Sequence, residues 1–156
     1  MPEITVIIPT YGKPLFLEKA IASVLNQTFK DLELVIVDDN DPDTEARQVT
    51  EGLVNEFMKQ DKRVKYLKHE KNKNGAVARN TGFAVARGKY ISLLDSDDEY
   101  KTERLQKCYD VMQQAPKSVA GVYTGCEFRR SGKTYYTYLN VKEGNYLVET
   151  LACKFM

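Results

Sequence analysis

The sequence has only three cysteines and no long apolar run, and each of these two shortages excludes a class of protein. Cys108, Cys126 and Cys153 are odd in number, widely spaced and in no metal-ligand pattern, so we expect reduced thiols rather than a disulfide framework or a zinc site. No apolar stretch approaches the roughly 20 residues that cross a bilayer, so no transmembrane segment is expected. The first residues also show no charged-then-apolar leader, and we therefore expect a cytoplasmic protein.

Neither sign of charge dominates. Lys and Arg number 23 and Asp and Glu 22, a net charge of +1 that argues against nucleic acid as a partner. The 156 residues, 42% of them hydrophobic and 29% charged, are typical of one globular domain with a substantial core.

Strand and helix patterns alternate over the first part of the chain, which predicts an α/β fold with a mostly parallel sheet. β-branched apolar runs predict the strands, and apolar residues at helical spacing predict the helices. In the third helix we place Val77, Thr81, Ala84 and Val85 on one face. The expected strands are 4–8, 32–37, 64–67 and 90–94, and the expected helices are 17–25, 44–59, 75–86 and 105–112, the last ending near Pro116.

The pattern changes after Pro116. We expect a strand at 119–124, a Tyr-rich hairpin of 127–130 and 133–139, and a helix from about Tyr146 whose apolar stripe reaches the last residues. The expected organisation is thus an α/β part, 1–115, and an incomplete region, 116–156, within one structural domain. We expect the protein to continue past Met156.

Three carboxylates crowd into four residues where the fourth expected strand ends, in Asp95-Ser96-Asp97-Asp98. Such crowding of like charges has an electrostatic cost unless a positive group lies between them. In an extended segment Asp95 and Asp97 share a face, and Mg²⁺ or Mn²⁺ prefers such oxygen ligands, commonly together with substrate phosphates. The alternative is an acidic N-cap for a helix after Tyr100.

Polar residues follow two other strands as well, in the segments 9–12 and 38–39. Ligands of open α/β sheets bind outside the carboxyl ends of the strands, so three such clusters at one edge indicate a site for a phosphorylated small molecule. Asp39 accepts hydrogen bonds only, and suits the N3–H of a uracil or a ribose hydroxyl. Tyr11 offers a stacking face, and Arg79 at a helix start suits phosphate.

Each of these residues has a structural alternative. Thr10 is suited to capping the next helix, and Tyr11 to packing on the sheet edge. Asp38 and Asp39 are suited to forming an Asx turn, and Arg79 to being a solvated charge. His69, without a cysteine or a second histidine nearby, is interpreted as a surface residue.

Five segments in order resemble the family 2 glycosyltransferases, which have the GT-A fold. The resemblance covers residues 4 to about 115 and rests on Val6-Ile7-Ile8-Pro9-Thr10-Tyr11, Val24-Leu25-Asn26-Gln27-Thr28, Leu34-Val35-Ile36-Val37-Asp38-Asp39, Ala78-Arg79-Asn80 and Leu94-Asp95-Ser96-Asp97-Asp98.

The resemblance implies a Rossmann-like three-layer sandwich and an inverting hexosyl- or hexosaminyltransferase that uses a nucleotide-sugar, most often a UDP-sugar, with Mn²⁺ or Mg²⁺. It implies a carbohydrate or lipid-linked acceptor, as in polysaccharide biosynthesis, and leaves open association with the inner membrane face. It gives Asp97, with Asp95, the metal site of the family's Asp-x-Asp element. The implied nucleotide-sugar contacts are Pro9, Thr10, Tyr11, Asp39 or its neighbour Asp38, Asn72, Arg79, Asp95 and Ser96.

The sequence departs from the family pattern in two places. Asn74 stands where the family usually has a glycine, five residues before the arginine. The family's acidic catalytic base has no counterpart between Cys126 and Met156, so we expect it beyond Met156.

Three other functions fit parts of this pattern. A response-regulator receiver would carry its acidic pair on the first strand, whereas here it follows the second. A dehydrogenase would need a glycine fingerprint after the first strand, which Pro9-Thr10-Tyr11-Gly12 is not. A non-catalytic module of transferase ancestry would keep the fold and lose affinity for metal and nucleotide.

Overall fold

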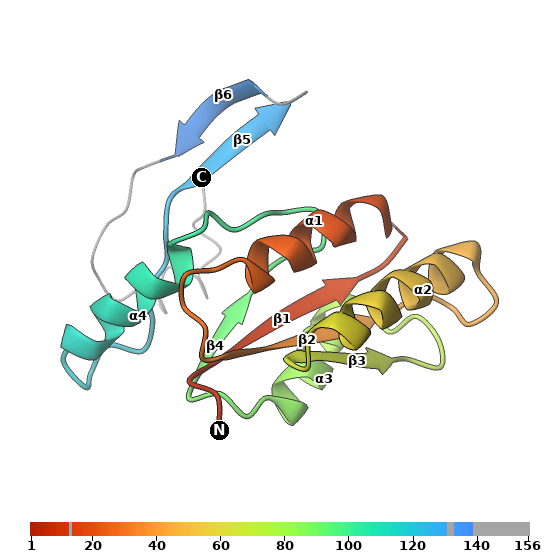
Figure 1. Ribbon diagram of the computed structural model, residues 1–156, viewed down its shortest axis with the longest axis horizontal. Helices are drawn as coiled ribbons and strands as arrows, with labels where there is room; N and C mark the ends of the chain where they lie inside the picture. Colours follow the sequence, from red (N-terminus) through yellow and green to blue (C-terminus); the bar gives the residue numbers. More distant parts are fainter. Residues whose placement is uncertain (13, 131–132, 139–156) are drawn as a thin grey trace, which may run out of the picture. The chain divides into compact units, whose positions relative to one another are not determined.

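The computed structural model describes residues 1–12, 14–130 and 133–138, in which helices and strands alternate as expected (Figure 1). The strands are β1 (Ile4–Thr10), β2 (Leu32–Asp38), β3 (Val64–Lys68), β4 (Tyr90–Leu93), β5 (Cys126–Arg130) and β6 (Lys133–Tyr138). The helices are α1 (Pro14–Leu25), α2 (Glu45–Gln60), α3 (Gly75–Val85) and α4 (Arg104–Gln114). The chain divides into two compact units, 1–107 and 108–156. The boundary that we expect near residue 115 stays a prediction.

The first unit is built on a parallel sheet with the strand order β3-β2-β1-β4. Thr10 pairs with Asp38, and Asp38 with Lys68, so β1, β2 and β3 end at the same edge. The chain moves from β1 to β3 in one direction and then crosses back to β4 on the other side of β1. Strand order therefore reverses between β1 and β4, and at such a point a crevice opens at the carboxyl ends of the strands.

Helices cover both faces of this sheet, with α1 and α2 on one face and α3 on the other (Figure 1). Right-handed crossovers require this arrangement, since the connection through α3 runs opposite to those through α1 and α2. All seven residues of β2 are buried, as expected for a central strand covered on both sides. The α/β fold with a parallel central sheet is thus confirmed.

Small residues bring α3 close to the sheet. Its buried residues are Ala78 and Gly82, and a Cβ on Gly82 would lie 2.5 Å from the Ile7 Cγ2 atom. Val77, Ala84 and Val85, which we place on one face, are exposed, so this face is not the one that packs against the sheet. Hydrophobicity favoured the valines, but the short distance between helix and sheet admits only the smallest side chains.

A saturated carboxylate lies at the opposite edge of the sheet. Glu33, near the start of β2, is 4% exposed at its side chain, and its Oε1 atom accepts from the Thr5 hydroxyl (2.8 Å) and the Arg87 N–H (2.7 Å). Its Oε2 atom accepts from the Arg87 guanidinium (3.0 Å) and the Lys65 ammonium (2.7 Å). Burial alone would raise the pKa of Glu33, but these donors outweigh it and lower the pKa to about 2.

In the second unit, β5 and β6 pair as the expected antiparallel hairpin, with Phe128 opposite Tyr136. The expected strand at 119–124 is wrong, because those residues form no strand and are mostly exposed. The helix expected from Tyr146 lies outside the described residues. No helix in the described part of the chain is both long and apolar enough to cross a membrane.

Candidate functional site

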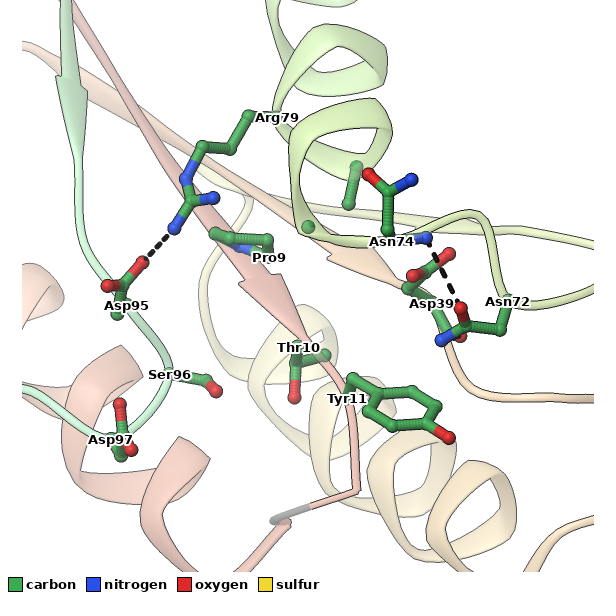
Figure 2. A pocket seen from close by; sticks show the side chains of 12 residues that line it. Pro9, Thr10, Tyr11, Asp39, Asn72, Asn74, Arg79, Asp95, Ser96 and Asp97 are labelled. Atoms are coloured by element: carbon green, nitrogen blue, oxygen red, sulfur yellow. Dashed lines mark hydrogen bonds and ion pairs between the residues drawn. The ribbon is translucent and has the colours of Figure 1, made fainter. Parts of the chain in front are cut away.

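A pocket of about 420 Å³ lies at the edge of the sheet where β1, β2 and β4 end, beside the amino-terminus of α3 (Figure 2). Its size is within the range of small-molecule sites. All the predicted site residues except Asp38 line it. The lining residues are Pro9, Thr10, Tyr11, Asp39, Asn72, Asn74, Gly75, Ala78, Arg79, Asp95, Ser96 and Asp97.

The end of β1 supplies an aromatic ring and a buried hydroxyl. Tyr11 is 57% exposed, so a face of its ring is open to a flat ligand ring. Thr10 is buried, and within the described residues its hydroxyl has no hydrogen-bond partner. The backbone then turns at Gly12, whose φ of 67° suits glycine and whose N–H donates to the Asn40 side-chain oxygen at 2.7 Å.

Two neighbouring aspartates at the end of β2 have different surroundings. The carboxylate of Asp38 is fully buried and accepts hydrogen bonds from Tyr66 Oη and from the Asn40 N–H (2.9 Å) and Nδ2 (2.7 Å), with Arg47 Nε at 3.4 Å. The bond to the Asn40 N–H is the Asx turn that the sequence offered as an alternative. Burial, and then the carboxylate of Asp38, raise the pKa of Tyr66. Asp38 therefore stabilises the strand end from beneath the pocket, whereas Asp39 lines the pocket.

Asp39 is held by a neighbour that the sequence did not reveal. His69 is not a surface residue, as interpreted, but is 7% exposed with its Nδ1 atom 2.6 Å from Asp39 Oδ1. The backbone N–H of Lys73 donates to the same oxygen at 2.8 Å. No sequence pattern indicates the role of the histidine, because its partner lies 30 residues away along the chain.

The loop before α3 lies against the end of β2. Asn72 donates from its side chain to the Asp39 carbonyl at 3.2 Å and from its backbone to Asp41 at 2.9 Å. Asn74 has φ 73° and ψ 163°, a region occupied almost only by glycine, and its side chain caps α3 by accepting from the Ala76 and Val77 N–H groups. Asn74 thus adopts the backbone conformation for which the family's glycine is suited, and adds a cap that glycine lacks.

Arg79 and Asp95 form an ion pair across the pocket, with Arg79 Nη2 2.5 Å from Asp95 Oδ1 (Figure 2). The arginine is on the first turns of α3 and the aspartate follows β4. Their side chains are 36% and 54% exposed, so both remain accessible to a ligand. The helix amino-terminus adds N–H groups and a partial positive charge on this side of the pocket.

The acidic segment after β4 keeps its carboxylates crowded. Burial, and then the charges of Asp97 and Asp95, raise the pKa of Asp98. The alternative, in which these aspartates form the N-cap of a helix after Tyr100, is excluded. That helix, α4, begins only at Arg104, too far along the chain for residues 95–98 to cap it. In the part of the chain that the structure describes, no group of three His, Cys, Asp or Glu side chains is arranged to hold a metal ion. Two hard oxygen donors, Asp95 and Asp97, do lie together on the pocket wall, and this donor set fits Mg²⁺ or Mn²⁺ when ligand oxygens complete the shell.

Asn74, Gly75 and Ala78 also line the pocket and were not predicted. The signal for Asn74 was its position just before a helix start, where asparagine is a good cap. Ala78 could be predicted as a pocket residue only if one knew which face of α3 lies against the sheet.

The fold is the one that the resemblance to family 2 glycosyltransferases implies, and comparison with known families agrees. The model of "Glycosyl transferase family 2" matches residues 5–151, and the chain belongs to this family. This membership sets aside the receiver and dehydrogenase alternatives.

Three known proteins show how far the similarity extends. The chain is 37% identical over 133 residues to the GalNAc(5)-diNAcBac-PP-undecaprenol beta-1,3-glucosyltransferase of Campylobacter jejuni, covering 85% of this chain and 40% of that protein. It is 33% identical over 151 residues to glycosyltransferase GlyG of Streptococcus pneumoniae, covering 96% of this chain and 47% of that protein. The crystal structure of S. aureus TarS 1–349 in complex with UDP-GlcNAc superimposes with a TM-score of 0.64 at 26% identity, over 72% of this chain and 31% of that one. The chain thus spans less than half the length of these relatives.

Proposed function

We propose that this chain is the donor-binding part of a glycosyltransferase, and that its pocket binds a nucleotide-activated sugar, a UDP-sugar, together with Mn²⁺ or Mg²⁺. The observation that carries the proposal is the pocket at the point of strand-order reversal, which combines the carboxylate of Asp39, an aromatic ring, a helix amino-terminus and two further aspartates. The similarity to TarS, which has been crystallised with UDP and with UDP-GlcNAc, supports a UDP-sugar.

In this proposal the pocket residues bind and orient the donor. Asp39 accepts the N3–H of the uracil, Tyr11 stacks on the ring, and Pro9 and Asn72 line the base pocket. Asp95 and Ser96 contact the ribose and phosphates, and the Thr10 hydroxyl lies at the floor.

The diphosphate lies on the positive side of the pocket. Arg79 and the amino-terminus of α3 offset its charge on one side. Asp97, with Asp95, would hold the divalent ion on the other. When bound, that ion neutralises charge on the diphosphate leaving group.

The acceptor in this proposal is a glycan or a lipid-linked carrier, to which the sugar is transferred with inversion. The name of the Campylobacter jejuni relative, which includes an undecaprenol diphosphate acceptor, supports the lipid-linked alternative. The proposed roles of the pocket aspartates leave none of them as the general base. We therefore propose that this chain alone binds donor and transfers sugar poorly, and turnover of a UDP-sugar by residues 1–156 would refute this.

Calorimetric titration with UDP, with and without Mn²⁺, tests the proposal. We expect binding that Mn²⁺ strengthens, and we expect Asp97→Ala to remove the Mn²⁺-dependent part. Asp31→Ala is the matched control, because it removes the same charge from an exposed residue just before β2, at the opposite edge of the sheet.

The outcomes separate the transferase from a non-catalytic module. Unchanged Mn²⁺ dependence in Asp97→Ala would defeat the metal assignment. Failure of the wild-type chain to bind UDP under either condition would favour the module that has kept the fold and lost the ligand.

A further inference from the structure

The two oxygens of the Asp39 carboxylate have different surroundings. Oδ1 lies 2.6 Å from His69 Nδ1 and 2.8 Å from the Lys73 N–H. A carboxylate oxygen has two lone pairs in its plane, so Oδ1 is fully used. Among the described residues no hydrogen bond ends on Oδ2, although Asp39 lines the pocket.

The hydrogen-bond partners of His69 determine which ring nitrogen carries the proton and how the ring is oriented. A carboxylate only accepts hydrogen bonds, so the Nδ1 atom must carry the proton that points at Asp39. The other ring nitrogen, Nε2, lies 2.8 Å from the Thr81 hydroxyl on α3. The His69 backbone donates to the Asp38 carbonyl at 2.9 Å and accepts from Arg47 Nη2 at 2.7 Å. With contacts at four positions, the ring cannot turn away from Asp39.

We infer that His69 is a positioning residue that sets nucleobase specificity, because it occupies Oδ1 and leaves Asp39 one free oxygen for the ligand. Uracil presents a single donor, N3–H, between two carbonyl acceptors, and one free carboxylate oxygen matches it. Guanine presents two adjacent donors, N1–H and the N2 amino group, and pairs best with both oxygens of a carboxylate. With Oδ1 already saturated, the second guanine donor is left unpaired, and an unpaired polar group in a site is strongly disfavoured.

This inference rests on the proposed function and makes it more specific. The test compares dissociation constants for UDP and GDP, which share the diphosphate and differ only in the base. Calorimetry at constant Mg²⁺ is applied to the wild-type chain, His69→Gln and His69→Asn. The asparagine amide nitrogen occupies the position of Nδ1 along the side chain and keeps the donor to Asp39. The glutamine amide nitrogen reaches instead toward Thr81 and frees Oδ1.

We expect the wild-type chain to prefer UDP to GDP at least about tenfold, as the loss of one hydrogen bond to a charged group implies. In His69→Gln the preference should fall about tenfold, and in His69→Asn it should stay near the wild-type value. A role of His69 in stability alone would weaken UDP and GDP equally and leave the ratio unchanged. Should His69→Gln fail to fold, N3-methyl-UDP tests the same contact on the wild-type chain and should bind at least about tenfold more weakly than UDP.

Two results would overturn the inference while the proposed function stands. One is a wild-type chain that binds GDP as tightly as UDP, and the other is a UDP-to-GDP ratio that is the same in His69→Gln as in the wild type. Failure of the wild-type chain to bind either nucleotide would instead defeat the proposed function, and the inference with it.

Discussion

The two ends of strand β2 carry buried carboxylates that are treated in opposite ways. At its start, Glu33 uses both oxygens on donors from Thr5, Lys65 and Arg87. Just after its end, Asp39 uses only one oxygen, on His69 and Lys73, and lines a pocket. A buried carboxylate with every lone pair satisfied has none left for a ligand, whereas one with an oxygen free can bind a ligand. The difference separates a structural from a functional carboxylate better than burial does.

The largest effect on stability is expected when the fully hydrogen-bonded carboxylate at the start of β2 is neutralised. Glu33→Gln keeps the shape but removes the charge that three donors share, and should lower the free energy of unfolding by about 2–3 kcal/mol. Urea denaturation measures this change. The affinity for UDP should not change, because Glu33 lies at the opposite edge of the sheet from the pocket. Glu103→Gln, at an exposed ion pair with Lys107, is the control and should have no measurable effect on stability.

Low pH should remove the contribution that the Glu33 carboxylate, at the start of β2, makes to the free energy of unfolding. The pKa of Glu33 is lowered from 4.5 to about 2 in the folded chain, so the folded state favours the carboxylate form. Its contribution is complete above about pH 4.5 and is lost as the pH falls toward about 2. Between about pH 5 and about pH 3 the wild-type chain should therefore lose more stability than Glu33→Gln does. Parallel loss in the two proteins would show that Glu33 is not the group that titrates.

A smaller change is expected at the other end of β2, and it concerns affinity. Asp39→Asn keeps an amide oxygen to accept from His69 and Lys73, but places a donor where the free oxygen was. UDP affinity should fall about tenfold, equivalent to about 1.4 kcal/mol, with a minor change in unfolding free energy. CDP should bind better relative to UDP, because the N3 atom of cytosine is an acceptor. Calorimetry on both nucleotides measures the change, and equal loss for UDP and CDP would contradict the role of Asp39 in reading the base.

The smallest effect is expected at the backbone beside the pocket. Asn74→Gly relieves a conformation that costs about 1–3 kcal/mol, but loses a few tenths of a kcal/mol of capping and adds chain entropy, so stability should rise by about 0.5 kcal/mol. Asn74→Ala keeps the strain and loses the cap, and should destabilise by about 1 kcal/mol. Thermal unfolding of the pair checks the signs. Asn74→Gly less stable than the wild type would show that the cap outweighs the strain.

Much of the first unit could be predicted from sequence because its elements depend on local patterns. The β-branched runs of β1 and β2, and the cap Thr44 before α2, place those elements within a few residues of their observed bounds. The predicted strand at 119–124 failed for the opposite reason. Strand propensity depends on packing and on pairing with another strand, and residues 119–124 pair with no strand of the described residues and are mostly exposed.

The residues that make up the candidate site could be predicted, but the hydrogen bonds and ion pairs among them could not. Strand ends meet at one edge of any parallel sheet, so the gathering of segments 9–11, 39 and 95–97 followed from topology. The separation of Asp38 from Asp39 did not, because it depends on Tyr66 and Arg47 approaching one carboxylate and His69 the other. The contacts of Tyr66 and His69 join residues 28 and 30 positions apart, and a sequence pattern does not encode them.

The missing side chain at Gly82 has a consequence well outside its own surroundings. It lets α3 pack directly on Ile7, and Arg79 lies about one helical turn earlier on the same helix. A methyl group there would lift the helix and carry the guanidinium away from Asp95 without touching any ligand. Inherited or engineered loss of donor affinity in such a protein can therefore originate on the buried face of a helix, at a residue that does not contact the ligand.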